Sequence, residues 1–231
     1  MTYRCVAASA AGFVQQLAVG YIAHGYYFYV RGWIPEPKSP VPVDQKLIAQ
    51  YGLAMSKWTR ARRKQAGAAG VQYLRCGRFF VLLATHGQHA FFTAEAGQIR
   101  DVRRCPLRFE GYSIGCRRGR DGAWHASVRI ERQRFAEVRR EFERLAVHRA
   151  VEELAVALRA IPYEPYAPVR DQLRVLLRAV NRRRKIAGLE LVPWDAPRWR
   201  RNPVRPFGAE TESRPDDDAG GGFRTGQRPD G

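Results

Sequence analysis

The sequence predicts an α+β protein, in which an antiparallel sheet of about five strands is packed by helices and followed by a C-terminal helical pair and a disordered tail. Three observations support this class. Runs of β-branched and aromatic residues, separated by glycine turns, lie between positions 71 and 130. Apolar residues then recur at three- and four-residue intervals over positions 132–187, which is typical of amphipathic helices. Positions 209–231 are acidic and then Gly-rich, with almost nothing to bury.

The length and composition fit one domain with appendages. A chain of 231 residues, of which 45% are hydrophobic, can bury a core of ordinary size. We expect five segments: an N-terminal extension (1–14), a sheet domain (15–130), a helical part (131–188), a basic Pro- and Arg-rich extension (189–208) and the disordered tail (209–231).

The strongest strand signal lies between Val71 and Thr93. The unbroken apolar run Phe79–Leu83 predicts a buried strand. Gly87 has the backbone freedom of a tight reversal, so we expect Ala90–Phe92 to return as the second strand of a hairpin. The rest of the sheet is expected to be organised around this hairpin.

The segments before this hairpin predict a strand, a linker and two helices. Leu17–Ile34 has apolar residues on odd and even positions, as in a central strand, with a bend at His24-Gly25. Pro35–Pro42 predicts a stiff linker. Asp44 is the predicted N-cap of a short helix, and a second, strongly basic helix is predicted from Ser56 to about Ala66.

The segments after the hairpin predict two more strands and then helices. Leu107–Cys116, with a bulge at Gly111, and Trp124–Ile130 are the predicted strands. A helix is expected over Arg132–Ala160, broken near His148. The proline-bracketed turn after it leads to a last helix over Val169–Ala187.

The charge balance points to a polyanionic partner. The chain has 40 Lys and Arg against 22 Asp and Glu, a net charge of +18. Most of the positive residues are Arg, whose planar guanidinium pairs with phosphate through two hydrogen bonds. Nucleic acid is the expected partner, with DNA favoured over RNA. The alternative is that each basic cluster only solvates the surface or stabilises a helix C-terminus.

Four basic clusters carry this prediction, three within predicted elements and one in the basic extension, Arg198–Arg205. The first three supply the predicted nucleic-acid-binding residues: Lys57, Arg60, Arg62, Arg63, Lys64, Arg117, Arg118, Arg120, Arg182, Arg183, Arg184 and Lys185. Trp58 and Trp124 lie beside two of the clusters, and aromatic rings next to Arg are suited to stacking on bases.

The cysteines and the hydropathy pattern indicate a cytoplasmic protein without a membrane partner. The four cysteines form no closely spaced pair, so we expect reduced thiols rather than a zinc site or a disulfide framework. The apolar N-terminal stretch is interrupted by Gln15, Gln16 and His24, which argues against a signal peptide or a membrane span. The pattern does not predict an oligomeric state.

Two pairs of residues are candidates for catalysis. His86 and His89 could both reach one divalent metal, Mg²⁺ or Mn²⁺; the alternative is a polar turn in which a histidine caps the strand. Tyr163 and Tyr166 lie in a rigid turn, where a tyrosine could attack a phosphodiester; the alternative is that they pack the turn.

The order of predicted elements from Leu17 to Ala160 resembles the RRM-like sheet of the HUH nucleases, which include replication initiators, relaxases and small tyrosine transposases. That family places His-apolar-His on a central strand to bind a metal, and a nucleophilic Tyr on a later helix. Here the histidines stand in His86-Gly87-Gln88-His89, which does not match that motif. The resemblance implies the metal role for the two histidines and the nucleophile role for Tyr163 or Tyr166.

The function predicted from these observations is nucleic-acid binding through Arg-rich surfaces, in a protein of a plasmid or mobile element. One alternative is a metal-dependent, HUH-type enzyme that nicks single-stranded DNA. A second alternative is a non-catalytic structural or interaction protein. The sequence leaves open whether the protein is an enzyme.

Overall fold

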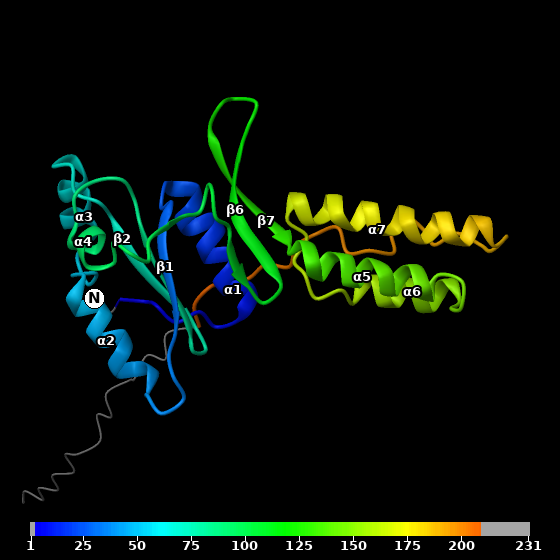
Figure 1. The fold of residues 1–231 in the computed structure, drawn as a ribbon, viewed down its shortest axis with the longest axis horizontal. Helices are drawn as coiled ribbons and strands as arrows, with labels where there is room; N and C mark the ends of the chain where they lie inside the picture. The colour runs from blue at the N-terminus through cyan, green and yellow to red at the C-terminus, as the bar shows by residue number, and fades with distance from the viewer. Residues whose placement is uncertain (1–2, 209–231) are drawn as a thin grey trace, which may run out of the picture.

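A computed structural model describes residues 3–208 and confirms the α+β class (Figure 1). In chain order the elements are α1 (Ala10–Gln15), the π-helix η1 (Gln16–Tyr21), the 3₁₀-helix η2 (Ile22–His24), β1 (Phe28–Trp33), α2 (Pro40–Gln50), α3 (Lys57–Gln65), β2 (Val71–Cys76), β3 (Phe79–Ala84), α4 (Ala90–Ala94), β4 (Arg100–Asp101), β5 (Leu107–Phe109), β6 (Tyr112–Arg118), β7 (Trp124–Ile130), α5 (Arg132–Leu145), α6 (Val151–Arg159) and α7 (Ala167–Ile186).

The described strands form two antiparallel sheets instead of the single sheet of about five strands that the sequence predicts. One sheet has the order β2-β3-β1-β4, and the other has the order β5-β6-β7. The expected bulge near Gly111 is a full reversal, because Glu110 and Gly111 both have positive φ angles, 46° and 74°. Leu107 consequently pairs with Ile114, and the predicted long strand is the β5–β6 hairpin.

The predicted hairpin between Phe79 and Phe92 is wrong in its second half. Strand β3 pairs instead with β2, through a turn at Gly77 with φ 57°, and with β1 on its other side. The chain after β3 forms the short helix α4. Its start is fixed by His89, whose Nδ1 accepts a hydrogen bond from the Phe91 amide at 3.0 Å.

The expected N-terminal extension and the strand predicted over Leu17–Ile34 are both corrected. The chain is helical from Ala10 to His24, and only Phe28–Trp33 is a strand. Ser9 caps the first helix, and Gly25, with φ 90°, ends the last one. An apolar residue at every second or third position suits a fully buried helix as well as a buried strand, so the pattern alone does not separate them.

The helical N-terminus joins the two sheets. The ring of Phe13 in α1 lies 5.8 Å from the ring of Phe79 in β3 and 4.4 Å from the ring of Phe109 in β5, measured between centroids. These residues belong to one buried cluster that also includes Ile114 and Val128 of the second sheet. The two sheets therefore share a hydrophobic core.

Asp44 is a buried partner of the sheet and not the predicted N-cap. Helix α2 begins with Pro40 at its first position, preceded by Ser39. Asp44 lies one turn further on, and its carboxylate accepts hydrogen bonds from Arg75 Nε at 2.8 Å and Nη2 at 2.7 Å. Tyr73 donates a third hydrogen bond to the same carboxylate at 2.5 Å. This network attaches α2 to strand β2.

The C-terminal helices agree with the prediction, including the break near His148. Residues 189–208 are not a free extension but return along the molecule to the N-terminal helix (Figure 1). Val192 and Ala196 are buried, and the Pro206 carbonyl accepts a hydrogen bond from the Ala8 amide at 2.9 Å. The predicted disordered tail, 209–231, lies outside the described residues. Within 3–208, the helices are too short or too polar to cross a membrane.

Candidate nucleic-acid interface

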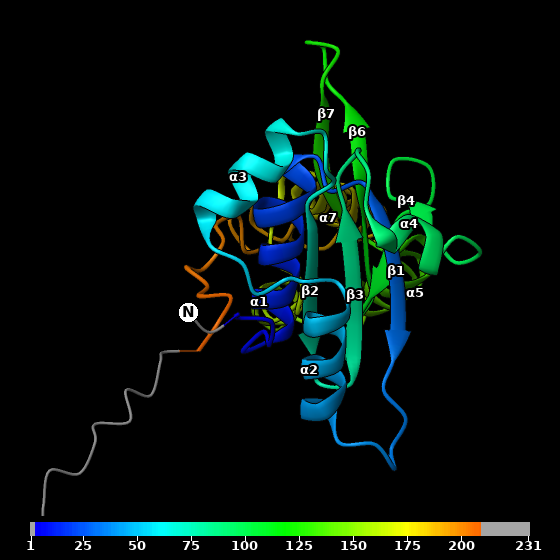
Figure 2. The same ribbon diagram turned by 90° about the vertical axis from the view of Figure 1, so that its left-hand side faces the viewer.

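Helix α3 presents a basic surface at one end of the first sheet (Figure 2). The Ser56 hydroxyl accepts a hydrogen bond from the Thr59 amide at 3.1 Å and so fixes the start of the helix. Trp58 is 85% exposed, and Arg62, Arg63 and Lys64 are also exposed. The side chain of Lys57 lies outside what the structure describes.

Two adjoining cavities lie beneath α3. The inner cavity, of about 280 Å³, extends to His89 and Tyr51, and the outer cavity, of about 1090 Å³, extends to Tyr3 and Gln72. Both cavities are lined by Arg60 and Lys64. The other basic side chains that line one or both are Arg4, His24, Arg63 and His89. No Asp or Glu lines either cavity in the described part of the chain, so this recess is suited to an anion.

Aromatic rings in fixed positions line the inner cavity. The hydroxyl of Tyr51 donates a hydrogen bond to Glu95, and its ring lies 6.3 Å from the imidazole of His89. The hydroxyl of Tyr26 accepts a hydrogen bond from Gln72 at 3.4 Å. Gly70 lies against this hydroxyl, since a Cβ atom there would be only 2.9 Å from it. The recess therefore combines aromatic walls with basic residues.

His89 lines the inner cavity, in surroundings that favour its neutral form. Burial, followed by the nearby charge of Arg63, lowers the pKa of His89 below its ordinary value of 6.5. A neutral imidazole suits its capping role, because Nδ1 must keep a lone pair to accept the Phe91 amide. His89 thus has a capping role, as in the alternative interpretation of the sequence, but it caps helix α4 and not the strand.

The predicted metal site receives little support from this geometry. His89 uses its Nδ1 lone pair within α4, and the exposed His86 ring packs edge-on against Phe28, with 4.7 Å between ring centroids. Among residues 3–208, no group of three or more His, Cys, Asp or Glu side chains is placed to hold a metal ion. Mg²⁺ or Mn²⁺ binding by His86 and His89 stays a prediction from the sequence.

The second basic element is the β6–β7 arm, the part of this hairpin that projects from the body (Figures 1 and 2). Its tip carries Arg117, Arg118 and Arg120, all exposed. The one carboxylate at the tip, Asp121, pairs with His125 at 2.9 Å, which lowers the pKa of Asp121. Within the described chain, the three arginines have no ion-pair partner.

Trp124, the first residue of β7, presents an aromatic ring next to the tip of the arm. The guanidinium groups of Arg118 and Arg103 lie 5.9 Å and 6.0 Å from its ring centroid. Arg103 is oriented by a bidentate pair with Asp101 and also lies over the ring of Tyr27, at 4.6 Å. Interleaved guanidinium groups and rings of this kind are suited to phosphates and exposed bases.

The structure places two of the three basic clusters that the sequence assigned to binding on the same side of the molecule. Helix α3 and the arm lie at the same upper side of the molecule in both views (Figures 1 and 2). The end of α7, with Arg182, Arg183 and Lys185 exposed, lies at the far end of the helical part. Arg184 is only 3% exposed and donates hydrogen bonds to the carbonyls of Ala146 and Arg149, each at 2.8 Å. Arg184 is therefore a structural residue.

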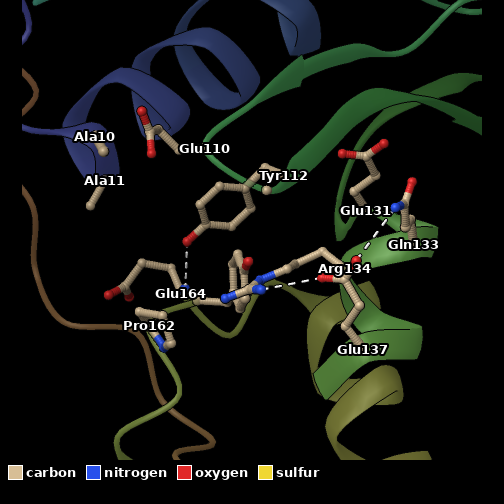
Figure 3. A pocket seen from close by; sticks show the side chains of 12 residues that line it. Ala10, Ala11, Glu110, Tyr112, Glu131, Gln133, Arg134, Glu137, Pro162 and Glu164 are labelled. Atoms are coloured by element: carbon tan, nitrogen blue, oxygen red, sulfur yellow. Dashed lines mark hydrogen bonds and ion pairs between the residues drawn. The ribbon is translucent and has the colours of Figure 1, made fainter. Parts of the chain in front are cut away.

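One of the two predicted nucleophiles, Tyr163, lies at a pocket with several carboxylates along its walls (Figure 3). This pocket, of about 640 Å³, is lined by Tyr163 and by the carboxylates of Glu110, Glu131, Glu137 and Glu164. Tyr163 is buried, and its ring packs edge-on against Tyr112 at 5.0 Å. Glu131, Glu137 and Glu164 are paired with Arg108, Arg134 and Arg198 at 2.9, 3.2 and 2.9 Å. Arg134 is the one basic side chain along this pocket in the described residues, and its pairing leaves no unpaired cation there for a phosphodiester.

The tyrosines and the histidines also lie apart. The hydroxyl of Tyr166 donates a hydrogen bond to Gln15 at 3.2 Å, and Arg201 covers its ring at 4.7 Å. In Figure 1, α4 and the end of α6 lie on opposite sides of the β6–β7 hairpin. The structure therefore does not bring the predicted nucleophiles and metal ligands into one site.

Several residues of the recess and the arm could not be identified from the sequence. Tyr26, Tyr51 and Arg103 stand alone in the sequence, without a motif, and only the fold places them beside basic residues. A weak signal was present for His24, which precedes a glycine at a break in an apolar run. No protein-family model matches the chain, and a comparison with curated proteins finds no match.

Proposed function

We propose that the protein binds nucleic acid through α3 and the β6–β7 arm. The observation that carries this proposal is that two exposed basic elements, distant in the sequence, both lie at the upper side of the molecule (Figures 1 and 2). Lys, Arg and His side chains line the recess beneath α3, and no Asp or Glu of the described residues does. Neutralising phosphates there would release counterions, which is the main source of affinity for a nucleic acid.

The contrast with α5 supports the choice of surface. Three of the five arginines of α5 are paired along the helix: Arg134 with Glu137 at 3.2 Å, Arg139 with Glu143 at 2.8 Å and Arg144 with Glu141 at 2.6 Å. Most of the positive charge on that face is therefore neutralised within the helix. Arg60, Arg62, Arg63 and Lys64 have no ion-pair partner within residues 3–208, so they are available to an external anion.

DNA fits this surface better than double-stranded RNA. The major groove of B-DNA admits a two-stranded β-ribbon, whereas the deep, narrow major groove of A-form RNA does not admit side chains. The β6–β7 arm is a projecting two-stranded ribbon with arginines at its tip. A DNA duplex beside an unpaired segment would engage the arm and the recess together.

Fluorescence anisotropy with a labelled DNA, titrated at several salt concentrations, tests the proposal. The natural chain should bind, and its affinity should fall about tenfold or more between 50 and 200 mM salt. Arg62→Glu/Arg63→Glu should weaken binding strongly without lowering the melting temperature. The control Arg182→Glu/Arg183→Glu makes the same charge change at the far end of α7 and should weaken binding much less. Equal losses, or no binding at about 50 mM salt, would contradict the proposal.

A further inference from the structure

The inner cavity beneath α3 has the chemistry of a nucleotide site. We propose that it takes one unstacked nucleotide of a single strand, with the base against the half-buried rings of Tyr26 and His89. The ring of Tyr51, only 2% exposed, packs beside His89. The phosphate then lies at Arg60, Arg63 and Lys64. This inference rests on the proposed function and adds to it a preference for unpaired nucleotides.

The size of the inner cavity is suited to one nucleotide. Its volume of about 280 Å³ is close to the lower limit of small-ligand pockets, about 300 Å³. A base within a duplex is stacked on both sides and cannot enter a pocket of this kind unless it leaves the helix, which costs a few kcal/mol. An already unpaired nucleotide avoids this cost, so single strands are the preferred ligand.

The walls favour stacking and not recognition of a particular base. The amides of Ala68, Ala69 and Gly70 donate to Arg63, Gln88 and Thr85 at 2.9–3.0 Å, so they offer no free donor to a base edge. Leu53 and Met55 add apolar surface to the same cavity. Stacking on such surfaces is tolerant of sequence, since every base has a π-face.

The outer cavity provides a path for the rest of the strand. It shares five lining residues with the inner cavity: His24, Tyr26, Met55, Arg60 and Lys64. It is larger, about 1090 Å³, and is also lined by Tyr3 and Tyr21. A strand with one nucleotide in the inner cavity would continue along the outer cavity, past Arg60 and Lys64.

The test compares three DNA ligands of equal length by anisotropy at one salt concentration. These ligands are a single strand, the same strand with abasic sites in its central part, and a blunt duplex. The intact single strand should bind on the order of tenfold more tightly than the abasic strand, because the abasic strand keeps its phosphates but has no base to stack. The blunt duplex should also bind more weakly than the intact single strand.

Matched variants test whether the preference for an intact single strand arises in the inner cavity. Arg63 lines the inner cavity and Arg62, its neighbour on α3, does not. Arg63→Ala should therefore lose more single-strand affinity than Arg62→Ala. Ala61→Phe, at an exposed helix position on the cavity wall, should remove the difference between intact and abasic strands while its melting temperature stays close to that of the natural chain.

The outcomes separate this inference from the proposed function. If the intact and abasic strands bind equally, and the two arginine variants lose affinity equally, the nucleotide site is excluded and nonspecific binding to phosphates remains. If none of the three ligands binds, both proposals are wrong. If only the duplex binds, the inner cavity is not the site and the arm alone accounts for binding.

Discussion

At the scale of single residues, charged side chains of this protein divide into structural and available groups. Arg184 and Arg183 are adjacent in the sequence, yet the first is buried and the second is exposed. A signal for this difference was present, because Arg184 follows Val180 by four residues and continues the buried face of α7. Asp44 gave no such signal, since its partner Arg75 is 31 residues away in the sequence.

The first prediction concerns the buried pair of Asp44 and Arg75, which are 6% and 8% exposed. Asp44→Ala should lower the free energy of unfolding by about 3–5 kcal/mol, because it leaves the Arg75 guanidinium buried without its partner. Urea denaturation measures this change. Asp171→Ala, which removes an exposed pair with Arg174, is the control and should have little effect. Similar losses in both variants would contradict the structural role of Asp44.

The second prediction concerns Arg184. Arg184→Ala should lower the melting temperature, because it removes the donor to the carbonyls of Ala146 and Arg149. Arg183→Ala should leave the melting temperature nearly unchanged. Thermal unfolding followed by circular dichroism compares the two. The reverse order of effects would show that the end of α7 is packed differently.

The third prediction concerns the pH dependence of stability through His89. Its folded pKa is lowered below 6.5, so between the folded pKa and about 6.5 the unfolded chain binds the extra proton. The resulting loss in the free energy of unfolding is absent above about pH 6.5, grows as the pH falls, and levels off below the folded pKa. His89→Asn keeps an N-cap and removes the titration. Its melting temperature should fall less than that of the natural chain on acidification; an equal fall would contradict the prediction.

At the scale of elements, the sequence predicts the isolated helices well and the strand pairing poorly. The helices α5, α6 and α7 follow from their apolar spacing. Glycines with positive φ angles, Gly67 and Gly188, closely follow α3 and α7. The pairing of β2 with β3 was missed because the turn at Gly77 is short and the later Gly87 is an equally strong turn signal. Helix α4 was missed because its start depends on a histidine cap, which is not a common helix signal.

The fourth prediction tests the β6–β7 arm as an element. Replacing Arg117, Arg118 and Arg120 with Ala should reduce the slope of log affinity against log salt by about 0.9 for each phosphate that the arm no longer neutralises. The melting temperature should not change, because these side chains are exposed and have no ion-pair partner within residues 3–208. An unchanged slope would show that the arm does not bind the nucleic acid.

At the scale of the whole molecule, the chain closes on itself through segments that the sequence marked as appendages. Residues 189–208 were expected to be a basic extension, yet Val192 and Ala196 are buried. The carbonyl of Pro206 also accepts a hydrogen bond from the amide of Ala8. The sequence could not predict this closure, because the partners are almost the full chain apart. The joining of the two sheets by Phe13 was also hidden, because its partners Phe79 and Phe109 are distant from it in the sequence.

The fifth prediction separates the two C-terminal segments. Removing residues 209–231 should leave the melting temperature nearly unchanged, since their composition offers almost nothing to bury. Ending the chain at residue 188 should lower the melting temperature, because it also removes the buried Val192 and Ala196. Differential scanning calorimetry of the two shortened chains checks both parts. A large loss in the first would show that 209–231 contributes to folding.

Hydrogen-exchange mass spectrometry with and without a DNA that has a duplex and a single-stranded segment tests the central claim most directly, since it reports which peptides the ligand protects. We expect protection in peptides that contain α3 and in those from the tip of the β6–β7 arm, with no change at the end of α7. Protection confined to residues 182–186, or to the pocket around Tyr163, would contradict the assignment of the binding surface.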